Sequence, residues 1–159
     1  MNLANPELGQ VVVCESEDRW TKLVRRQIQA QDPFRVIRVP GYKFLRQFLS
    51  SRTAIFVAIE IDSQNVEPIA ELVRRSISGG KNHRFVGLCQ TLDRSNAVAL
   101  RCCGLDACYF SLTNVQSVIR LARRHFATLA KAAISNVQAD SAPLDLLSGF
   151  WDRLPTFNR

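Results

Sequence analysis

Acidic, hydroxyl and thiol side chains follow four apolar runs of this sequence, at the point where each run ends. If these runs are parallel strands, their carboxyl ends meet at one edge of a sheet, which is where α/β proteins gather functional groups. The side chains are Glu15, Ser16 and Glu17 after the first run, Glu60 and Asp62 at the second, Cys89, Gln90 and Thr91 after the third, and Ser111 after the fourth.

Other catalytic and cofactor chemistries lack the residues they need. The sequence has neither G-x-G-x-x-G nor G-x-x-x-x-G-K-[ST], so the usual glycine-rich phosphate loops are absent. His83 precedes an expected strand and His125 lies within an expected helix, so neither is placed beside Cys89 as a catalytic base. The five cysteines show no C-x-x-C spacing, which indicates reduced core thiols and argues against a zinc site. We expect no enzyme activity, no metal and no cofactor.

Apolar patterning predicts five strands that alternate with five helices, and this alternation predicts a parallel sheet with right-handed crossovers. The expected strands are Val11–Cys14, Phe34–Val39, Ala54–Ile61, Phe85–Cys89 and Ala107–Phe110. The first three expected helices run from Trp20 to Asp32-Pro33, over Phe44–Leu49, and over Val66–Ile77 before Gly79-Gly80. The fourth begins at an Asp93 or Ser95 cap and continues through Ala97–Arg101 to Gly104. The fifth begins at a Thr113 or Asn114 cap and continues through Val115 to Leu129.

The chain has 159 residues, which suffice for one domain, and its net charge of +7 comes mainly from arginine. No apolar run is long enough to cross a bilayer and no secretory signal begins the chain, so we expect a cytoplasmic protein. Pairs such as Arg25-Arg26, Arg74-Arg75 and Arg123-Arg124 are typical of solvated helix faces. A basic docking surface is the alternative, and nucleic-acid binding is less favoured because the arginines are scattered.

Residues 134–159 differ in pattern from the predicted domain at residues 1–133. A polar linker is followed by an amphipathic segment that is costly to leave in water. We expect this segment to fold back onto the domain, or to dock on a partner protein or a second copy of the chain. Its apolar residues are Leu144, Leu146, Leu147, Phe150, Trp151 and Leu154.

Over about residues 10–130 the sequence resembles the receiver domains of bacterial response regulators. The matching features are VVVCESEDRW and GLDACYFSL, the second being similar to the family's Gly-Ala-Asp-Asp-Tyr-Leu-Thr-Lys-Pro stretch, and the spacing from Cys89 to Ser111. The resemblance implies a doubly wound, flavodoxin-like α/β fold, with a five-stranded parallel sheet in the order 2-1-3-4-5 and, here, a C-terminal extension.

The resemblance also implies that the family's phosphorylation pocket is degenerate. That pocket needs two acids after the first strand to hold Mg²⁺, an Asp at the end of the third, a Thr or Ser after the fourth and a Lys after the fifth. At these positions the chain has Glu15 and Ser16, then Ile59 or Glu60 depending on a one-residue register, then Cys89, then Ser111. Phosphoryl transfer is not expected, and Glu60 is either a permanent negative charge or an ordinary surface acid.

By this resemblance we expect a phosphorylation-independent pseudo-receiver that serves as a protein-interaction module in bacterial signalling. The alternative is a binding module for a small or anionic ligand, which would use Glu15, Ser16, Cys89 and Ser111; a nucleic-acid-associated basic protein is the lesser alternative. The expected interaction surface follows the fourth helix, fifth strand and fifth helix and extends into the C-terminal segment: Arg101, Tyr109, Arg120, Arg123, Arg124, Phe150 and Trp151.

Overall fold

The computed structural model describes residues 9–50 and 54–140. The strands are β1 (Gly9–Cys14), β2 (Phe34–Val39), β3 (Phe56–Glu60), β4 (Arg84–Leu88) and β5 (Ala107–Tyr109). The helices are α1 (Arg19–Gln27), α2 (Tyr42–Ser50), α3 (Val66–Ser78), α4 (Arg94–Cys102), the 3₁₀ helix η1 (Leu112–Asn114) and α5 (Val115–Asp140).

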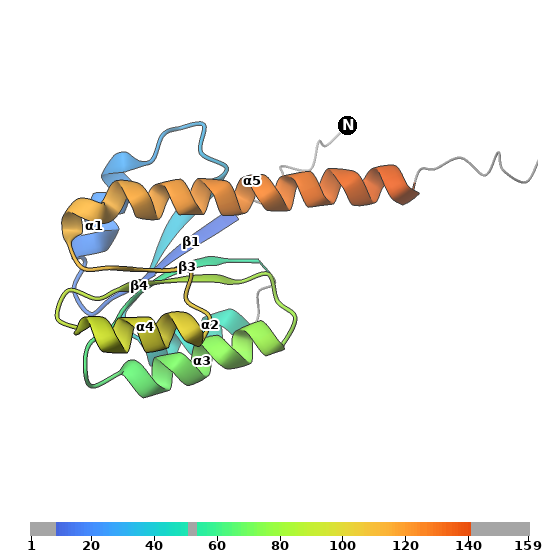
Figure 1. The fold of residues 1–159 in the computed structure, drawn as a ribbon. Coiled ribbons are helices and arrows are strands. Elements are labelled where there is room, and N and C mark those ends of the chain that lie inside the picture. The colour runs from blue at the N-terminus through green and yellow to red at the C-terminus, as the bar shows by residue number, and fades with distance from the viewer. Residues whose placement is uncertain (1–8, 51–53, 141–159) are drawn as a thin grey trace, which may run out of the picture. The chain divides into compact units, whose positions relative to one another are not determined.

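The five strands form one parallel sheet in the order β2-β1-β3-β4-β5, which confirms the predicted fold and strand order. Helix α1 and the part of α5 up to Phe126 lie on one face of the sheet, and α2, α3 and α4 lie on the other (Figure 1). The nearly continuous apolar run in β3 is explained by this arrangement, because a central parallel strand is buried on both faces.

Alternate residues of β3 face the two helical layers. Val57 and Ile59 belong to the core cluster that includes Leu45 of α2 and Ile69 of α3. Phe56 points to the opposite side, where its ring centroid lies 6.2 Å from that of His125 in α5. This alternation decides which side chains reach the carboxyl edge of the sheet.

The chain consists of two compact units, Met1–Phe126 and Ala127–Arg159. Within the second unit, the side chains of residues 127–136 are exposed except for half-buried Leu129. Helix α5 continues to Asp140, so residues 136–140 are helical although their polar composition predicted a linker. The predicted boundary after residue 133 falls inside this helix.

Two predictions for the first helices were wrong. Helix α1 ends at Gln27 instead of continuing to Asp32-Pro33, and Ile28 is extended (φ −73°, ψ 139°). The Asp32 carboxylate accepts a hydrogen bond from the backbone N–H of Gln29 at 2.9 Å, which favours a turn over further helix. In α2, the predicted apolar stripe comprises Phe44, Leu45, Phe48 and Leu49. Leu45 and Leu49 are buried and Phe48 packs against the core, whereas Phe44 is 59% exposed.

The capping of the later helices was predicted in part. Asp93, one of the two candidates for α4, accepts a hydrogen bond from the N–H of Asn96 at 2.9 Å. Before α5 the structure adds a short helix that was not predicted, because the Ser111 side chain accepts from the N–H of Thr113 and begins η1, which contains both predicted caps, Thr113 and Asn114. An extra 3₁₀ turn therefore separates β5 from α5.

Helix α5 is joined to the turn before β2 by a bidentate ion pair. Arg123 Nε lies 2.7 Å from Asp32 Oδ1, and Arg123 Nη2 lies 2.9 Å from Asp32 Oδ2. The Asp32 side chain is 5% exposed, and the hydrogen bonds from Arg123 hold the pKa of its carboxyl group below its usual range. Arg123 thus has a structural role in addition to its place on the predicted interaction surface.

We expect Arg123→Ala to lower the urea midpoint of unfolding, because it leaves a shielded Asp32 carboxylate without its two strongest donors. Arg120→Ala removes a charge one turn earlier in the same helix and is the matched control. Equal midpoints for the two variants would contradict a structural role for the pair.

His125 is a buried titratable group on the α5 side of the sheet. It packs against Phe56 and Phe126, and within the described chain its Nε2 has no hydrogen-bond partner. Burial, together with the nearby charges of Arg84 and His83, lowers the pKa of His125 to about 4. The neutral imidazole is therefore the form that the fold favours.

We expect the free energy of unfolding to fall as the pH drops from 7 to 5. The unfolded chain, in which the His pKa is about 6.5, binds a proton in this range that the folded chain does not bind. This difference lowers the free energy of unfolding by about 2 kcal/mol at pH 5. Urea titrations at the two pH values measure the loss, and His125→Leu should remove most of it. An equal loss in the variant would show that other groups cause the pH dependence.

Candidate functional site

The carboxyl edge of the sheet begins with a buried carboxylate, Glu15, which is 2% exposed. Its Oε2 accepts the backbone N–H of Trp20 at 2.9 Å, and its Oε1 accepts the N–H of Thr21 at 2.7 Å and the Thr21 hydroxyl at 2.5 Å. These N–H groups belong to the first turn of α1, where a helix has no internal acceptors. Glu15 therefore caps α1, while Asp18 at the helix start makes no side-chain cap.

The second carboxylate at this edge belongs to Glu60, the last residue of β3. Its Oε2 accepts hydrogen bonds from both the backbone N–H and the hydroxyl of Ser16, each at 3.0 Å. Its Oε1 lies 3.3 Å from Nη2 of Arg19. These contacts tie the end of β3 to the loop after β1 and to the first residue of α1.

The two candidates for the end of β3 occupy different environments. Ile59 is fully buried and packs in the core cluster with Ile61, two residues further along. Glu60 lies between them on the other side of the strand, and its carboxylate reaches Ser16. At the carboxyl edge the functional group is thus Glu60, and Ile59 is a core residue.

Two arginines at this edge were missed from the sequence. Arg19 pairs with Glu60 and also with Glu17, whose carboxylate lies 3.1 Å from its Nε. Arg38, near the end of β2, donates from Nη2 to the carbonyl oxygen of Ser16 at 2.6 Å. The signal for Arg38 was available, because strand order 2-1-3 places the end of β2 beside the end of β1.

Cys89 follows β4 directly and is fully buried. Its backbone N–H donates to the carbonyl oxygen of Tyr109 at 2.7 Å. A hydrogen bond shared with the Cys108 thiol, together with burial, raises the pKa of Cys89, while the same bond and Arg101 lower the pKa of Cys108. The Cys89 thiol thus faces its neighbour in β5, and it is protonated at neutral pH.

Ser111 does not share the contacts that join Glu60 to Ser16. It is exposed, and its hydroxyl lies 2.9 Å from the Thr113 hydroxyl in the turn that begins η1. Of the predicted pocket residues, the structure brings Ser16 and Glu60 into contact, places Glu15 beside them as a helix cap, and gives Cys89 and Ser111 other partners.

These residues do not fit a Mg²⁺ ion, which needs several free oxygen ligands. Both oxygens of Glu15 accept hydrogen bonds from α1, and both oxygens of Glu60 are engaged by Ser16 and Arg19. Two guanidinium groups, from Arg19 and Arg38, add positive charge at this edge, which opposes the binding of a cation. Across residues 9–50 and 54–140, no group of three acidic, histidine or cysteine side chains is arranged to hold a metal.

The predicted interaction surface is partly assembled in the structure. The charge of Arg101 on α4 acts on the Cys108 thiol of β5, and the charge of Arg120 on α5 acts on the Tyr109 hydroxyl of the same strand, so each of the two helices carries an arginine near β5. Burial raises the pKa of Tyr109, and Arg120 opposes that rise. Arg124 is exposed on α5, whereas Phe150 and Trp151 lie outside the described residues.

Two exposed apolar side chains, one on α4 and one directly after β5, were not singled out from the sequence as surface residues. Val98 of α4 is 62% exposed, and Phe110, directly after β5, is 41% exposed. Exposed apolar groups beside basic residues are typical of protein-binding surfaces.

None of the helices in the described ranges is long and apolar enough to cross a membrane.

Comparisons with known proteins match the fold and not the sequence. No protein-family model matches this chain, and no curated protein matches it. A response regulator from Thermotoga maritima is 18% identical, with a TM-score of 0.56 over 70% of this chain and 98% of that one. A receiver domain from Francisella is 12% identical, with a TM-score of 0.56 over 76% and 98% of the two chains.

A third similar structure is a response regulator from Burkholderia pseudomallei that carries a phosphorylated aspartic acid, a calcium ion and citrate. It is 16% identical, with a TM-score of 0.56 over 80% of this chain and 75% of that one. At such identities the likeness concerns the backbone arrangement alone. This chain has the fold of a response-regulator receiver domain.

Proposed function

We propose that this protein is a phosphorylation-independent pseudo-receiver, a signalling module that acts by binding a protein partner. The observation that carries the proposal is the engagement of Glu60. Its carboxylate stands at the end of β3, where receivers carry the phosphoacceptor Asp, and it is already bound by Ser16 and Arg19.

Three further features support the loss of phosphoryl transfer. The acid after β1, Glu15, is used as a helix cap, and the guanidinium groups of Arg19 and Arg38 add positive charge at the same edge. Cys89 supplies a protonated thiol in place of a hydroxyl. Ser111 stands in place of the lysine and caps η1, so no ammonium group follows β5 to neutralise a transferring phosphoryl group.

Glu60 is then a permanent negative charge instead of a switchable one. Its side chain is 23% exposed, and two donors of Ser16 together with Arg19 hold it in place. An ordinary surface acid would have fewer fixed contacts and more freedom. A fixed carboxylate keeps the loop after β1 and the end of β3 in one arrangement, so partner binding needs no chemical trigger.

The partner is expected on the face formed by α4, β5 and α5. Val98 and Phe110 supply exposed apolar area there, and Arg101 and Arg120 supply positive charge. A complementary partner presents apolar side chains with acidic neighbours, and a second copy of this chain is one form of such a partner.

We expect the double variant Val98→Ser, Phe110→Ser to weaken partner binding about 10-fold or more, because it removes the exposed apolar contacts of this face. Phe44→Ser, at an exposed phenylalanine of α2, is the matched control and should bind normally. The partner is identified by capturing it on this protein from an extract of the native host. Titration of the purified pair then measures the binding affinity, and sedimentation tests whether the chain associates with itself. Binding that is lost equally in the control, or that requires a phosphoryl donor, would contradict the proposal.

We expect the Ser16 hydroxyl and Glu60 to be energetically coupled by about 1 kcal/mol in the free energy of unfolding, as for one typical hydrogen bond, because the backbone N–H of Ser16 remains in the variant. The measurement is a double-mutant cycle with Ser16→Ala and Glu60→Gln in urea. Ser16→Ala combined with Glu67→Gln, an acid in the first turn of α3, is the control cycle and should be additive. No coupling between Ser16 and Glu60 would show that Glu60 is an ordinary surface acid.

A further inference from the structure

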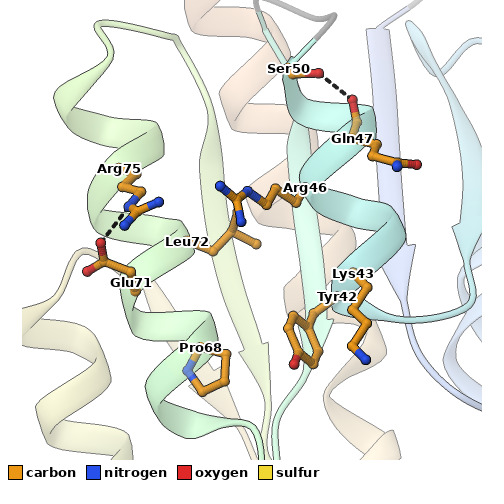
Figure 2. Close-up of a pocket in the computed structure, with 9 residues that line it drawn as sticks. All are labelled: Tyr42, Lys43, Arg46, Gln47, Ser50, Pro68, Glu71, Leu72 and Arg75. Carbon is orange, nitrogen blue, oxygen red and sulfur yellow. Dashed lines mark hydrogen bonds and ion pairs between the residues drawn. The ribbon is translucent and has the colours of Figure 1, made fainter.

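A groove of about 740 Å³ lies between α2 and α3, on the opposite face of the sheet from α1 and α5 (Figures 1 and 2). Its volume falls in the range of about 300–1,000 Å³ that is usual for sites that hold small molecules. Neither the strand-end residues nor the α4–β5–α5 face lines it. The proposed function therefore leaves this groove without a role.

The floor of the groove is apolar and anchored. Tyr42 and Leu72 are half-buried and pack against the core cluster beneath the two helices. Figure 2 shows Tyr42 of α2 and Pro68 of α3 at one end of the groove, with Leu72 further along. A tyrosine ring fixed in this way presents a flat surface on which a planar group can stack.

The middle of the groove is positively charged. In Figure 2, Arg46 extends from α2 over Leu72 toward α3, where Arg75 is bound to Glu71. Arg75 Nε and Glu71 Oε1 lie 2.5 Å apart, so this arginine is held in position and partly neutralised. Within the described part of the chain, no ion pair or hydrogen bond of Arg46 or Lys43 is found, although Lys43 also lines the groove.

The charge of the lining is therefore unbalanced, with three cations (Lys43, Arg46 and Arg75) against one carboxylate (Glu71). Guanidinium groups are the donors best matched to the oxygens of phosphate and carboxylate, because their planar fork can give two parallel hydrogen bonds. The two parts of the groove thus favour different parts of one ligand: a flat ring at the end beside Tyr42, and an anion in the middle beside Arg46.

We propose that this groove binds a small molecule in which a planar ring is joined to a phosphate group, the chemical class of nucleotides. The ring stacks on Tyr42 between Pro68 and Leu72, and the phosphate takes Arg46 and Lys43 as its donors. A ligand of this class needs no glycine-rich loop here, because side chains of two helices supply the contacts. The site is independent of the pseudo-receiver proposal and of its strand-end residues.

Isothermal titration calorimetry with the full chain tests the site, using the four ribonucleoside monophosphates, the matching nucleosides and inorganic phosphate as probes. We expect at least one monophosphate to bind at least 10-fold more tightly than its nucleoside or phosphate alone, because only it fills both parts of the groove. The loss of one charge-assisted contact corresponds to about 10- to 100-fold in affinity, so Arg46→Gln should weaken that binding by this factor.

Arg26→Gln is the matched control, because it removes the same charge from an exposed position on α1, on the other face of the sheet. It should leave the affinity unchanged, and Tyr42→Leu should weaken the nucleotide while leaving inorganic phosphate unaffected. Circular dichroism checks that each variant is folded. The proposal is overturned if no monophosphate binds, if nucleoside or phosphate binds as tightly, or if Arg46→Gln and Arg26→Gln weaken binding equally.

Discussion

A carboxylate that folding removes from water must find all its hydrogen-bond partners inside the protein, and Glu15 meets this requirement with the first turn of α1. The constraint fixes where α1 begins and how the loop after β1 runs. That loop then presents the N–H and the hydroxyl of Ser16 to the end of β3, where Glu60 accepts both. The polar contacts of this edge thus depend on the position of one buried acid.

In the proposed pseudo-receiver, the same constraint gives this edge a structural role in place of a chemical one. In a receiver fold, acids at the ends of β1 and β3 have to remain free to bind a cation and accept a phosphoryl group. Here Glu15 is occupied by α1, and Glu60 is occupied by Ser16 and Arg19, so neither carboxylate is available. These contacts support the proposed module, which would bind a partner without being switched.

Much of the fold could be predicted from the sequence, because strands buried on both faces give continuous apolar runs and amphipathic helices give a regular stripe. The predicted alternation and the order 2-1-3-4-5 are confirmed. The errors concern residues whose roles are set by partners distant in sequence. Phe44 fits a helical stripe but lies outside the core, and α1 ends early at a turn whose Asp32 is bound by Arg123 of α5.

The candidate site could be predicted only as a set of strand-end residues. The choice between Ile59 and Glu60 depends on which face each side chain takes, and a one-residue shift reverses it. The roles of Arg19 and Arg38 depend on long side chains that reach across neighbouring strands, and spacing alone does not show where they end. The groove between α2 and α3 likewise depends on how two helices pack, which no local pattern records.

The most direct measurement of the central claim is the intact mass of the protein after incubation with acetyl phosphate and Mg²⁺, with an active receiver domain as a positive control. We expect the mass of this chain to remain unchanged while the control gains one phosphoryl group, because Glu15 and Glu60 are engaged by the protein's own donors. An acid-stable mass increase elsewhere would not bear on the strand-end site, whereas a hydroxylamine-sensitive phosphoryl adduct on a strand-end carboxylate would contradict the pseudo-receiver assignment.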